Sequence, residues 1–348
     1  MKKIKIDWKK VSDYIIKTSN GLALGLFSTL IIGTIIGTIG KMFPAGEVRN
    51  LFLTLNYLLA RSTGFGIGLG IALSLKQDGL KLIACAVSGF IAANFAWGIN
   101  PTAITFQIGD PLVIYFVVLI TTELLKLILK KKTAVDIILV PLLTLLMASI
   151  ITLIIGKPVS MVTTLVGDLV NAAVTIQPFL MGIVISVLMG IALTAPISSA
   201  AIANAIKLGG IAGGASVVGC AVQMIGFAVM SRKDNNIGTV LSVGFGTSML
   251  QFKNIVRKPI IWLPTIIVSA ILGPLATVVF KIQTSPAGAG MGTSGLVGPI
   301  DTLGQMGTNI TSILSVILML FVLPAVLVWI VDVIFRKKAW IVQGDLKL

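Results

Sequence analysis

The sequence has no histidine among its 348 residues. This absence excludes histidine as an acid–base catalyst, as a metal ligand and as a phosphorylated group on this chain. Only two cysteines occur, Cys85 and Cys220, and each lies inside an apolar run, where a cysteine usually acts as a small hydrophobic side chain. We therefore expect no disulfide, no metal site, no bound cofactor and no catalytic residue on this chain.

Charged side chains are also scarce, at 11% of residues, compared with about 25% in soluble proteins. Hydrophobic residues make up 56% of the chain, and its mean hydropathy is +1.04. This composition excludes a soluble enzyme. It predicts an all-α polytopic membrane protein, because helices satisfy their own backbone hydrogen bonds in lipid.

Acidic residues are the rarer charged type: 12 Asp and Glu against 27 Lys and Arg give a net charge of +15. The basic residues cluster at the ends of apolar runs, at residues 2–17, 130–132, 253–258 and 336–338. This pattern is typical of the cytoplasmic loops of membrane proteins, whereas nucleic-acid binding requires a basic patch on one folded face. We expect contact with the lipid bilayer and no nucleic-acid partner.

A membrane-spanning helix needs about 20 apolar residues. Ten largely uncharged runs predict about ten transmembrane helices, two of them short, at residues 18–40, 62–75, 82–100, 111–129, 137–156, 175–193, 208–230, 237–252, 259–280 and 309–335. Ten spans place both termini in the cytoplasm and residues 231–233 outside. A basic interfacial helix at residues 1–17 precedes the spans, and a short tail at residues 339–348 follows them.

Several short matches indicate an internal repeat. TLIIG occurs at residues 29–33 and 152–156, GIAL at 70–73 and 190–193, and Cys-Ala-Val at 85–87 and 220–222. Glu47 and Asp168 begin a further match, at an offset of 121. We expect a first repeat at residues 18–133 and a second at 134–256, followed by two spans at 257–338. Whether the repeats run parallel or inverted stays open.

The second copy contains a stretch that a lipid-facing helix does not explain. No charged side chain occurs between Asp168 and Lys207, yet residues 194–205 read TAPISSAAIANA. Non-helical backbone at membrane depth occurs where it is buried in protein or lines a cavity. We predict a broken segment at residues 194–206, with Pro196 at the break and Ser198, Ser199 and Asn204 facing a polar solute. Small-residue packing between helices is the alternative.

A glycine-rich loop at residues 284–307 is the second unusual stretch. Gly290, Gly292 and Gly295 alternate there with Thr293 and Ser294. Consecutive backbone N–H groups in such a loop can bind an anion, and the glycines can act as hinges of a re-entrant segment. An exposed extracellular loop is the alternative interpretation.

Polar side chains inside the apolar runs complete the candidate set. Gln223 and Gln251 lie at membrane depth, where an amide requires a hydrogen-bond partner. Sugars are bound by amides and hydroxyls, so both are candidate sugar contacts, although hydrogen bonding between helices explains each equally well. Glu47, Asp168 and Asp301 are candidate ionisable groups, since carboxylates near spans are often functional.

The second half of the chain resembles a known family. GCAVQMIGFAV at residues 219–229, GTSMLQFKNIVRKPIIWLP at 246–264 and GAGMGTSGLVG at 288–298 are similar to bacterial phosphotransferase-system IIC-type membrane proteins. This sugar permease family also includes regulators similar to the perfringolysin regulator. The resemblance implies a sugar-translocating subunit in the bacterial cytoplasmic membrane, with phosphorylation carried out by separate IIA and IIB proteins. No fused IIB domain is present in this sequence.

The sequence therefore predicts a IIC-type sugar permease that forms a homo-oligomer. The side chains expected to contact the sugar are Ser198, Ser199, Asn204, Gln223, Gln251, Thr293 and Ser294. The glycine-rich loop would act as a gate or as a phosphate-tolerant wall, and residues 253–258 would dock a IIB protein. Two alternatives remain: a transporter or channel for another polar or anionic solute, uncoupled from phosphorylation, and a membrane sensor that regulates transcription.

Overall fold

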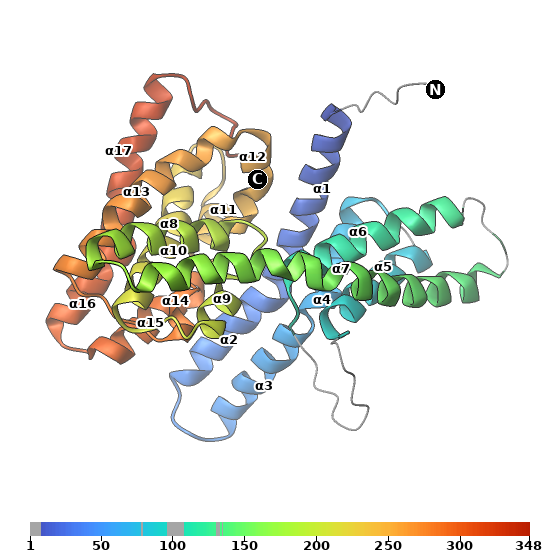
Figure 1. Cartoon of the computed structure of the whole chain (residues 1–348), viewed down its shortest axis with the longest axis horizontal. Helices are drawn as coiled ribbons and strands as arrows, with labels where there is room; N and C mark the ends of the chain where they lie inside the picture. Colours follow the sequence, from blue (N-terminus) through green and yellow to red (C-terminus); the bar gives the residue numbers. More distant parts are fainter. Residues whose placement is uncertain (1–7, 78, 96–107, 130–132, 134) are drawn as a thin grey trace.

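The computed structural model describes residues 8–77, 79–95, 108–129, 133 and 135–348, and all the regular elements in these ranges are helices (Figure 1). Six helical segments are long and apolar enough to cross a membrane, judged by length and composition: Asp13–Lys41, Pro111–Ile128, Asp136–Val174, Gly210–Ser231, Pro259–Val279 and Ile310–Lys337. Shorter apolar helices lie between them. The all-helical membrane architecture agrees with the sequence prediction.

The first half begins with one continuous helical segment. Helix α1 (Trp8–Leu26) passes through a π-helical turn (Phe27–Ile31) into α2 (Ile32–Lys41). The described part of the predicted interfacial helix is thus the first turns of α1 and not a separate element. The physical reason is that residues 8–41 contain no proline to interrupt the helix.

Glycines bring the next helices close together. Helices α3 (Glu47–Arg61), α4 (Thr63–Ser74), α5 (Gly79–Asn94) and α6 (Pro111–Ile128) follow α2. A Cβ atom on Gly25 of α1 would collide with the Gly66 carbonyl oxygen of α4, so the two backbones touch. Close contact of this kind requires small residues, which is common between membrane helices. The predicted second span, residues 62–75, corresponds to α4, and α3 is a separate helix.

Helix α7 (Asp136–Val174) connects the two halves of the molecule. Its 39 residues correspond to a length of roughly 58 Å, about twice the thickness of a bilayer core. Figure 1 shows α7 nearly perpendicular to α1 and α17, crossing from the first half to the second. The predicted fifth span is therefore the first half of a longer helix, which bridges the two halves.

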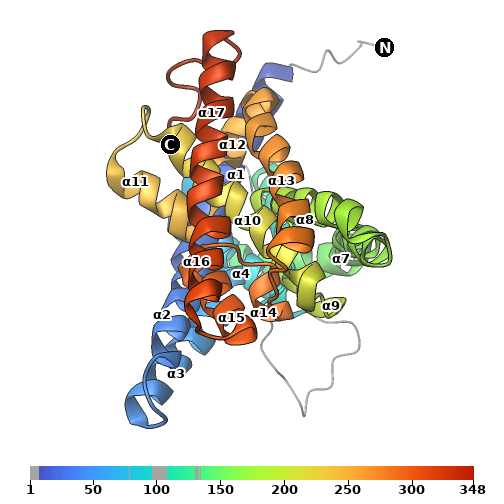
Figure 2. The ribbon, with the colours of Figure 1, turned by 90° about the vertical axis from the view of Figure 1, so that its left-hand side faces the viewer.

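The second half is built around α10 (Gly210–Ser231), whose side chains are almost all buried. Helices α8 (Pro178–Thr194), α13 (Leu263–Pro274) and α17 (Leu323–Lys337) pack around it, as Figure 2 shows. Its lower part holds α9 (Ser199–Ala205), α14 (Pro286–Ala289), α15 (Val297–Met306) and α16 (Ile310–Ile317). This layer of short helices contains the predicted broken segment and glycine-rich loop.

The predicted eighth span does not cross the molecule. It consists of α11 (Ile237–Leu241), a π-helical turn (Ser242–Gly246), a 3-10 turn (Ser248–Gln251) and α12 (Phe252–Arg257). Asn235 before it and Gln251 at its end both donate hydrogen bonds to the carbonyl oxygen of Leu346. The segment therefore turns back on itself as a hairpin, which places residues 231–233 on the same face as the tail.

The C-terminal tail, residues 339–348, folds back onto this hairpin. Ile341 and Leu346 are buried, and Asp345 forms an ion pair of 2.6 Å with Lys258. The carboxylate of Asp234 accepts hydrogen bonds from the backbone N–H groups of Gly344 and Leu346. The tail is thus an integral part of the fold.

Candidate functional site

The broken segment forms where the sequence predicts it. Helix α8 ends at Thr194, residues 195–198 are non-helical, and α9 begins at Ser199. Pro196 has no backbone N–H to continue the helix, and it forces the residue before it into an extended conformation. Ala195 adopts that conformation, with φ −70° and ψ 162°. Ala195 and Pro196 are buried, and Ile197 and Ser198 are half-buried, in keeping with the rule that such backbone in a membrane is covered by protein or lines a cavity.

The glycine-rich loop packs against the broken segment. The Ser199 hydroxyl donates a hydrogen bond of 2.7 Å to the Gly290 carbonyl oxygen. A Cβ atom on Gly290 would lie only 2.5 Å from the Ser199 carbonyl oxygen, so only glycine allows this contact. Gly292 and Gly295 both have φ +53°, in the left-handed region that favours glycine. Two segments more than 80 residues apart in the sequence therefore meet here.

The hairpin at residues 237–252 reaches the same point. Thr293 in the glycine-rich loop donates a hydrogen bond to the carbonyl oxygen of Gly244, near the tip of the hairpin. At that tip Thr247 is extended, between the π-helical turn and the 3-10 turn. The glycine-rich loop also turns back on itself, because Asp301 in α15 bonds to residues 284 and 285 at the start of the loop. Two hairpins thus meet beside the broken segment.

A small cavity lies where these three segments meet. Its volume is about 60 Å³, and it is lined by Leu26, Leu30, Ile31, Pro111, Leu193, Ile197, Ser198, Ser199, Ala200, Gly246, Thr247, Met249, Gly290, Met291 and Ser294. Pockets for small molecules usually measure about 300–1,000 Å³, and a water molecule occupies about 30 Å³ in the liquid. The cavity is therefore small, with space for very few water molecules.

Ser294 differs from the other hydroxyls of this region. Its side chain is 2% exposed, and its Oγ atom has no hydrogen-bond partner in the described part of the protein. The hydroxyls of Ser199 and Thr293 are both used to hold backbone carbonyl oxygens. A buried hydroxyl without a partner costs free energy unless a ligand or water binds it. Ser294 is thus a hydroxyl available to a molecule in the cavity.

Gln223 lies directly behind the cavity wall. Its Oε1 atom accepts hydrogen bonds from Trp262 at 3.0 Å, Thr265 at 2.9 Å and Thr194 at 3.3 Å. Thr194 also shares a hydrogen bond of 2.8 Å with Ser248. Thr194 and Ser248 directly follow Leu193 and Thr247, which line the cavity. The network thus connects the broken segment to the hairpin. The Nε2 atom of Gln223 has no described hydrogen-bond partner.

Other candidate residues lie outside the cavity. Asn204 is exposed and donates a hydrogen bond to the Ala200 carbonyl oxygen within α9. The Gln251 amide donates to Leu346 and accepts from Asn254, so both of its ends hold the C-terminal tail in place. Glu47 and Asp168 are exposed, at the start of α3 and in α7.

Asp301 fixes the glycine-rich loop. It accepts hydrogen bonds from the Thr284 hydroxyl at 2.6 Å, the Ser285 N–H at 2.8 Å and the Ser285 hydroxyl at 2.9 Å. The carboxylate therefore ties α15 to the start of the loop. Within the described ranges, no group of three or more Cys, Asp or Glu residues could hold a metal ion.

Sequence reasoning missed the residues that connect the three segments. Thr247 and Ser248 belong to the GTSM stretch at residues 246–249, and Trp262 and Thr265 lie further along the chain. The only sequence signal was a run of small polar residues inside an apolar segment, the same signal that identified TAPISSAAIANA. The missing information was that residues 237–252 turn back on themselves.

Comparison with known proteins gives the family. The family model described as "Phosphotransferase system, EIIC" matches residues 16–348. Searches of curated proteins and of solved structures find no significant match. The family match covers nearly the whole chain and confirms the resemblance that the second-half motifs indicate. The chain therefore belongs to the phosphotransferase-system EIIC family, and it is the multi-pass membrane permease component of a sugar phosphotransferase system.

Proposed function

We propose that the cavity between the broken segment and the two hairpins is the sugar-binding site of this permease. The observation that carries the proposal is the convergence of three segments in which the helix is interrupted, joined by the Ser199–Gly290 and Thr293–Gly244 hydrogen bonds. Transporters commonly form their substrate sites from discontinuous helices of this kind. Ser294 brings a hydroxyl without a described partner, Ser199 can still accept a hydrogen bond, and Ser198 and apolar side chains complete the lining.

The two hairpins would act as gates. A sugar is much larger than a space of about 60 Å³, so binding requires at least one hairpin to move. Pro196, Gly290, Gly292 and Gly295 are the positions at which the backbone leaves regular helix, and we propose them as hinges. Asp301 would keep one end of the glycine-rich loop fixed during this motion. We leave Asn204, Gln251, Glu47 and Asp168 out of the site.

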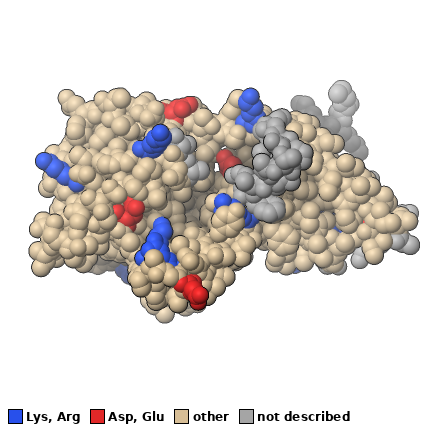
Figure 3. Space-filling view, turned by 90° about the horizontal axis from the view of Figure 1, so that it is seen from below, with Lys and Arg blue, Asp and Glu red and all other residues tan. Residues whose placement is uncertain are grey.

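We further propose that both termini face the cytoplasm. The tail brings together the basic residues 231–233, 253–258 and 336–338 on one face, which supports a cytoplasmic orientation for it. The opposite face, seen in Figure 3, shows only scattered charged side chains. A separate IIB protein would then dock at residues 253–258, beside the tail.

The internal repeat and a homo-oligomer remain part of the proposal. In both matched regions, a helix containing GIAL packs closely on the helix with the matched cysteine: α4 on α5 through Gly68, and α8 on α10 through Gly190. This supports a duplication of residues 18–133 and 134–256, with residues 257–338 added. About ten membrane segments, some of them re-entrant, would result. A second subunit would pack on the exposed apolar side chains of α7, such as Leu142 and Ile150.

Ligand binding by the purified protein tests the proposed site. Neutral sugars, polyols, sugar phosphates and simple anions would be screened by thermal unfolding in detergent. A ligand at 100 times its dissociation constant stabilises a protein by about 2.7 kcal/mol. We expect stabilisation by one neutral sugar, and uptake of that sugar into vesicles only when IIA and IIB proteins and a phosphoryl donor are inside. Stabilisation by anions alone would contradict the proposal, and binding without uptake would indicate a sensor.

A further inference from the structure

We infer that the seam between α1 and α4 binds one anionic phospholipid, with its headgroup in a lysine-lined pocket and an acyl chain in the adjoining apolar groove. The pocket measures about 370 Å³, and its lining includes Lys10, Lys17, Lys76, Lys126, Asp13 and Tyr14. It lies where the first turns of α1 meet the ends of α4 and α6. Basic pockets between membrane helices on the cytoplasmic side suit anionic headgroups.

The charges in the pocket are not balanced by its acids. Four lysines face Asp13 in the lining, and Glu123 lies beside it. The Glu123 carboxylate accepts hydrogen bonds from Lys126 at 2.7 Å and from the Tyr14 hydroxyl at 2.8 Å, so its charge is already matched. Neither Lys17 nor Lys76 has an acidic partner within 4 Å in the described part of the chain. The pocket thus keeps a net positive charge.

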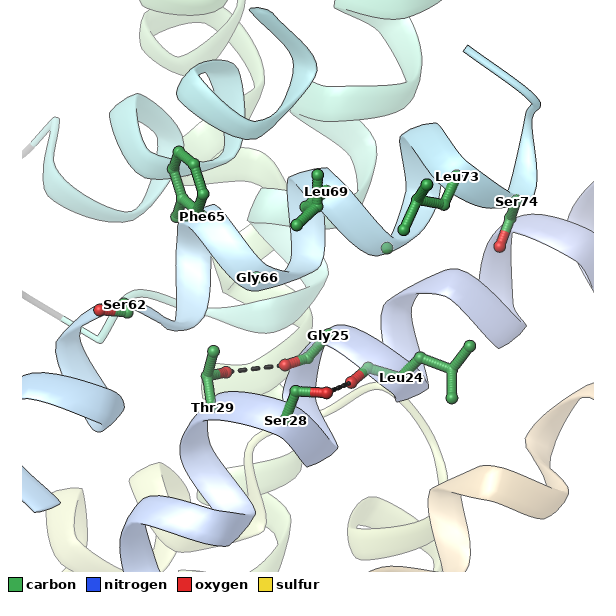
Figure 4. Close-up of a pocket in the computed structure, with 11 residues that line it drawn as sticks. Leu24, Gly25, Ser28, Thr29, Ser62, Phe65, Gly66, Leu69, Leu73 and Ser74 are labelled. Atoms are coloured by element: carbon green, nitrogen blue, oxygen red, sulfur yellow. Dashed lines mark hydrogen bonds between the residues drawn. The ribbon is translucent and has the colours of Figure 1, made fainter. Parts of the chain in front are cut away.

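The groove continues directly from this pocket, since Ser74 lines both. It measures about 470 Å³ and follows α1 and α4 past Leu24, Phe65 and Leu73 (Figure 4). These three side chains are 49%, 41% and 58% exposed, so the groove opens to the surroundings of the protein. Gly25 and Gly66 form part of its lining, where side chains are absent.

The groove is apolar despite two hydroxyl residues in the π-helical turn that follows α1. Ser28 donates to the Leu24 carbonyl oxygen at 2.9 Å and Thr29 to the Gly25 carbonyl oxygen at 2.7 Å, as the dashed lines in Figure 4 show. The distance along α1 from Lys17 to Thr29 is roughly 18 Å. One leaflet of the hydrocarbon core is about 15 Å thick, so the groove matches an acyl chain in length.

Native mass spectrometry of the delipidated full chain tests this inference. Phosphatidylglycerol and phosphatidylcholine with identical acyl chains would be added to wild type and to a Lys17→Gln, Lys76→Gln variant. We expect wild type to prefer phosphatidylglycerol, and the variant to lose about thirtyfold in affinity for it, the effect of two lysines near a membrane surface. The matched control is Lys157→Gln with Lys281→Gln, which removes the same charge from exposed positions outside the pocket and should bind as wild type does.

Two further measurements distinguish a bound phospholipid from a free anion in the pocket. Leu73→Trp should fill the groove and weaken binding of both lipids, and inorganic phosphate should not displace phosphatidylglycerol. Equal binding of the two lipids, or equal losses in the lysine variant and its control, would overturn the inference. So would efficient displacement by phosphate, which would indicate a free-anion site. Thermal unfolding in lipid-free detergent shows whether the two lysine substitutions only lower the stability of the protein.

Discussion

Gln223 illustrates, at the scale of single residues, how polar groups are held inside the apolar bundle. The amide oxygen of Gln223 accepts hydrogen bonds from the side chains of Trp262, Thr265 and Thr194. Both threonines have a second partner, whereas the indole N–H of Trp262 donates its one hydrogen bond to Gln223. The indole is therefore the group that depends most on Gln223.

Gln223→Leu should destabilise the protein by about 1–3 kcal/mol, because the buried indole N–H would lose its acceptor. Thermal unfolding in detergent measures the change. In a double-mutant cycle with Trp262→Phe, the two losses should be less than additive, since both changes remove one hydrogen bond. Fully additive losses would show that Gln223 and Trp262 act independently.

At the scale of single elements, close backbone contacts at glycines fix the position of the short segments around the cavity. The glycine-rich loop approaches α9 at Gly290, α10 at Gly292 and α2 at Gly295. Sequence alone predicted that the loop was unusual, because four glycines cannot form a stable lipid-facing helix. It could not predict these partners, since the contacts join residues far apart in the chain.

Gly290→Ala should push the loop away from the broken segment. The added Cβ would lie 2.5 Å from the Ser199 carbonyl oxygen and 2.6 Å from the Ala200 backbone, so one of the two must move. We expect a loss of about 1–3 kcal/mol in unfolding free energy, together with weaker sugar binding. Gly304→Ala is the control: it lies within α15 with open space around it, and should be neutral or stabilising by up to about 1 kcal/mol.

The tail should be sensitive to acid through Asp345. Burial alone would raise the pKa of this carboxyl, but hydrogen bonds from Lys258 and the Val342 N–H, with the charges of Lys258 and Arg257, bring the pKa below its usual value. A depressed pKa in the folded state stabilises the protein above the unfolded-state pKa, near 4. That contribution is lost as the pH falls through the folded-state value.

Thermal unfolding of the wild-type protein between pH 7 and pH 3 should therefore show a decrease in stability below about pH 4. This decrease should be smaller in Asp345→Asn. At pH 7 the variant should be less stable than wild type, because Lys258 loses its ion pair. If Asp345→Asn and wild type showed parallel pH profiles, the ion pair would have no part in holding the tail.

The whole molecule consists of two helical halves joined by α7, and the three interrupted segments that line the cavity lie together in the second half. The composition and the long apolar runs were sufficient to predict the membrane class and most helix positions. They were insufficient for topology, because a re-entrant hairpin and a membrane span have the same composition. Residues 237–252 were predicted as a span for this reason, and the fifth span was ended at residue 156 because Lys157 interrupts the apolar run of α7.

Cysteine labelling in intact cells distinguishes these topologies. Cys85 and Cys220 are buried, so the wild-type chain should give little background with a membrane-impermeant thiol reagent. Lys233→Cys and Gln343→Cys should react from the same side of the membrane, and Asn309→Cys from the opposite side. Reaction of positions 233 and 343 from opposite sides would restore the spanning interpretation of residues 237–252.

The proposed site overlaps with the residues that the sequence indicated. Proline and hydroxyl residues inside an apolar run pointed to the broken segment and Ser199, and clustered glycines pointed to Ser294. Gln251 lies outside the proposed site, because its amide bonds to the backbone of Leu346, a partner that sequence alone cannot indicate. The tail looked short and unimportant in sequence, yet its buried side chains and its hydrogen bonds fix the face where we expect the IIB protein.

Sugar binding by Ser294→Ala, compared with Ser269→Ala, tests the central claim most directly. Both serines are buried and have hydroxyls without a described partner, but only Ser294 lines the cavity. Isothermal titration with the sugar that stabilises wild type should show a loss of about three- to tenfold in affinity for Ser294→Ala, the effect of one hydrogen bond. Ser269→Ala should bind as wild type does. Unchanged affinity in Ser294→Ala, or equal losses in both variants, would contradict the proposed site.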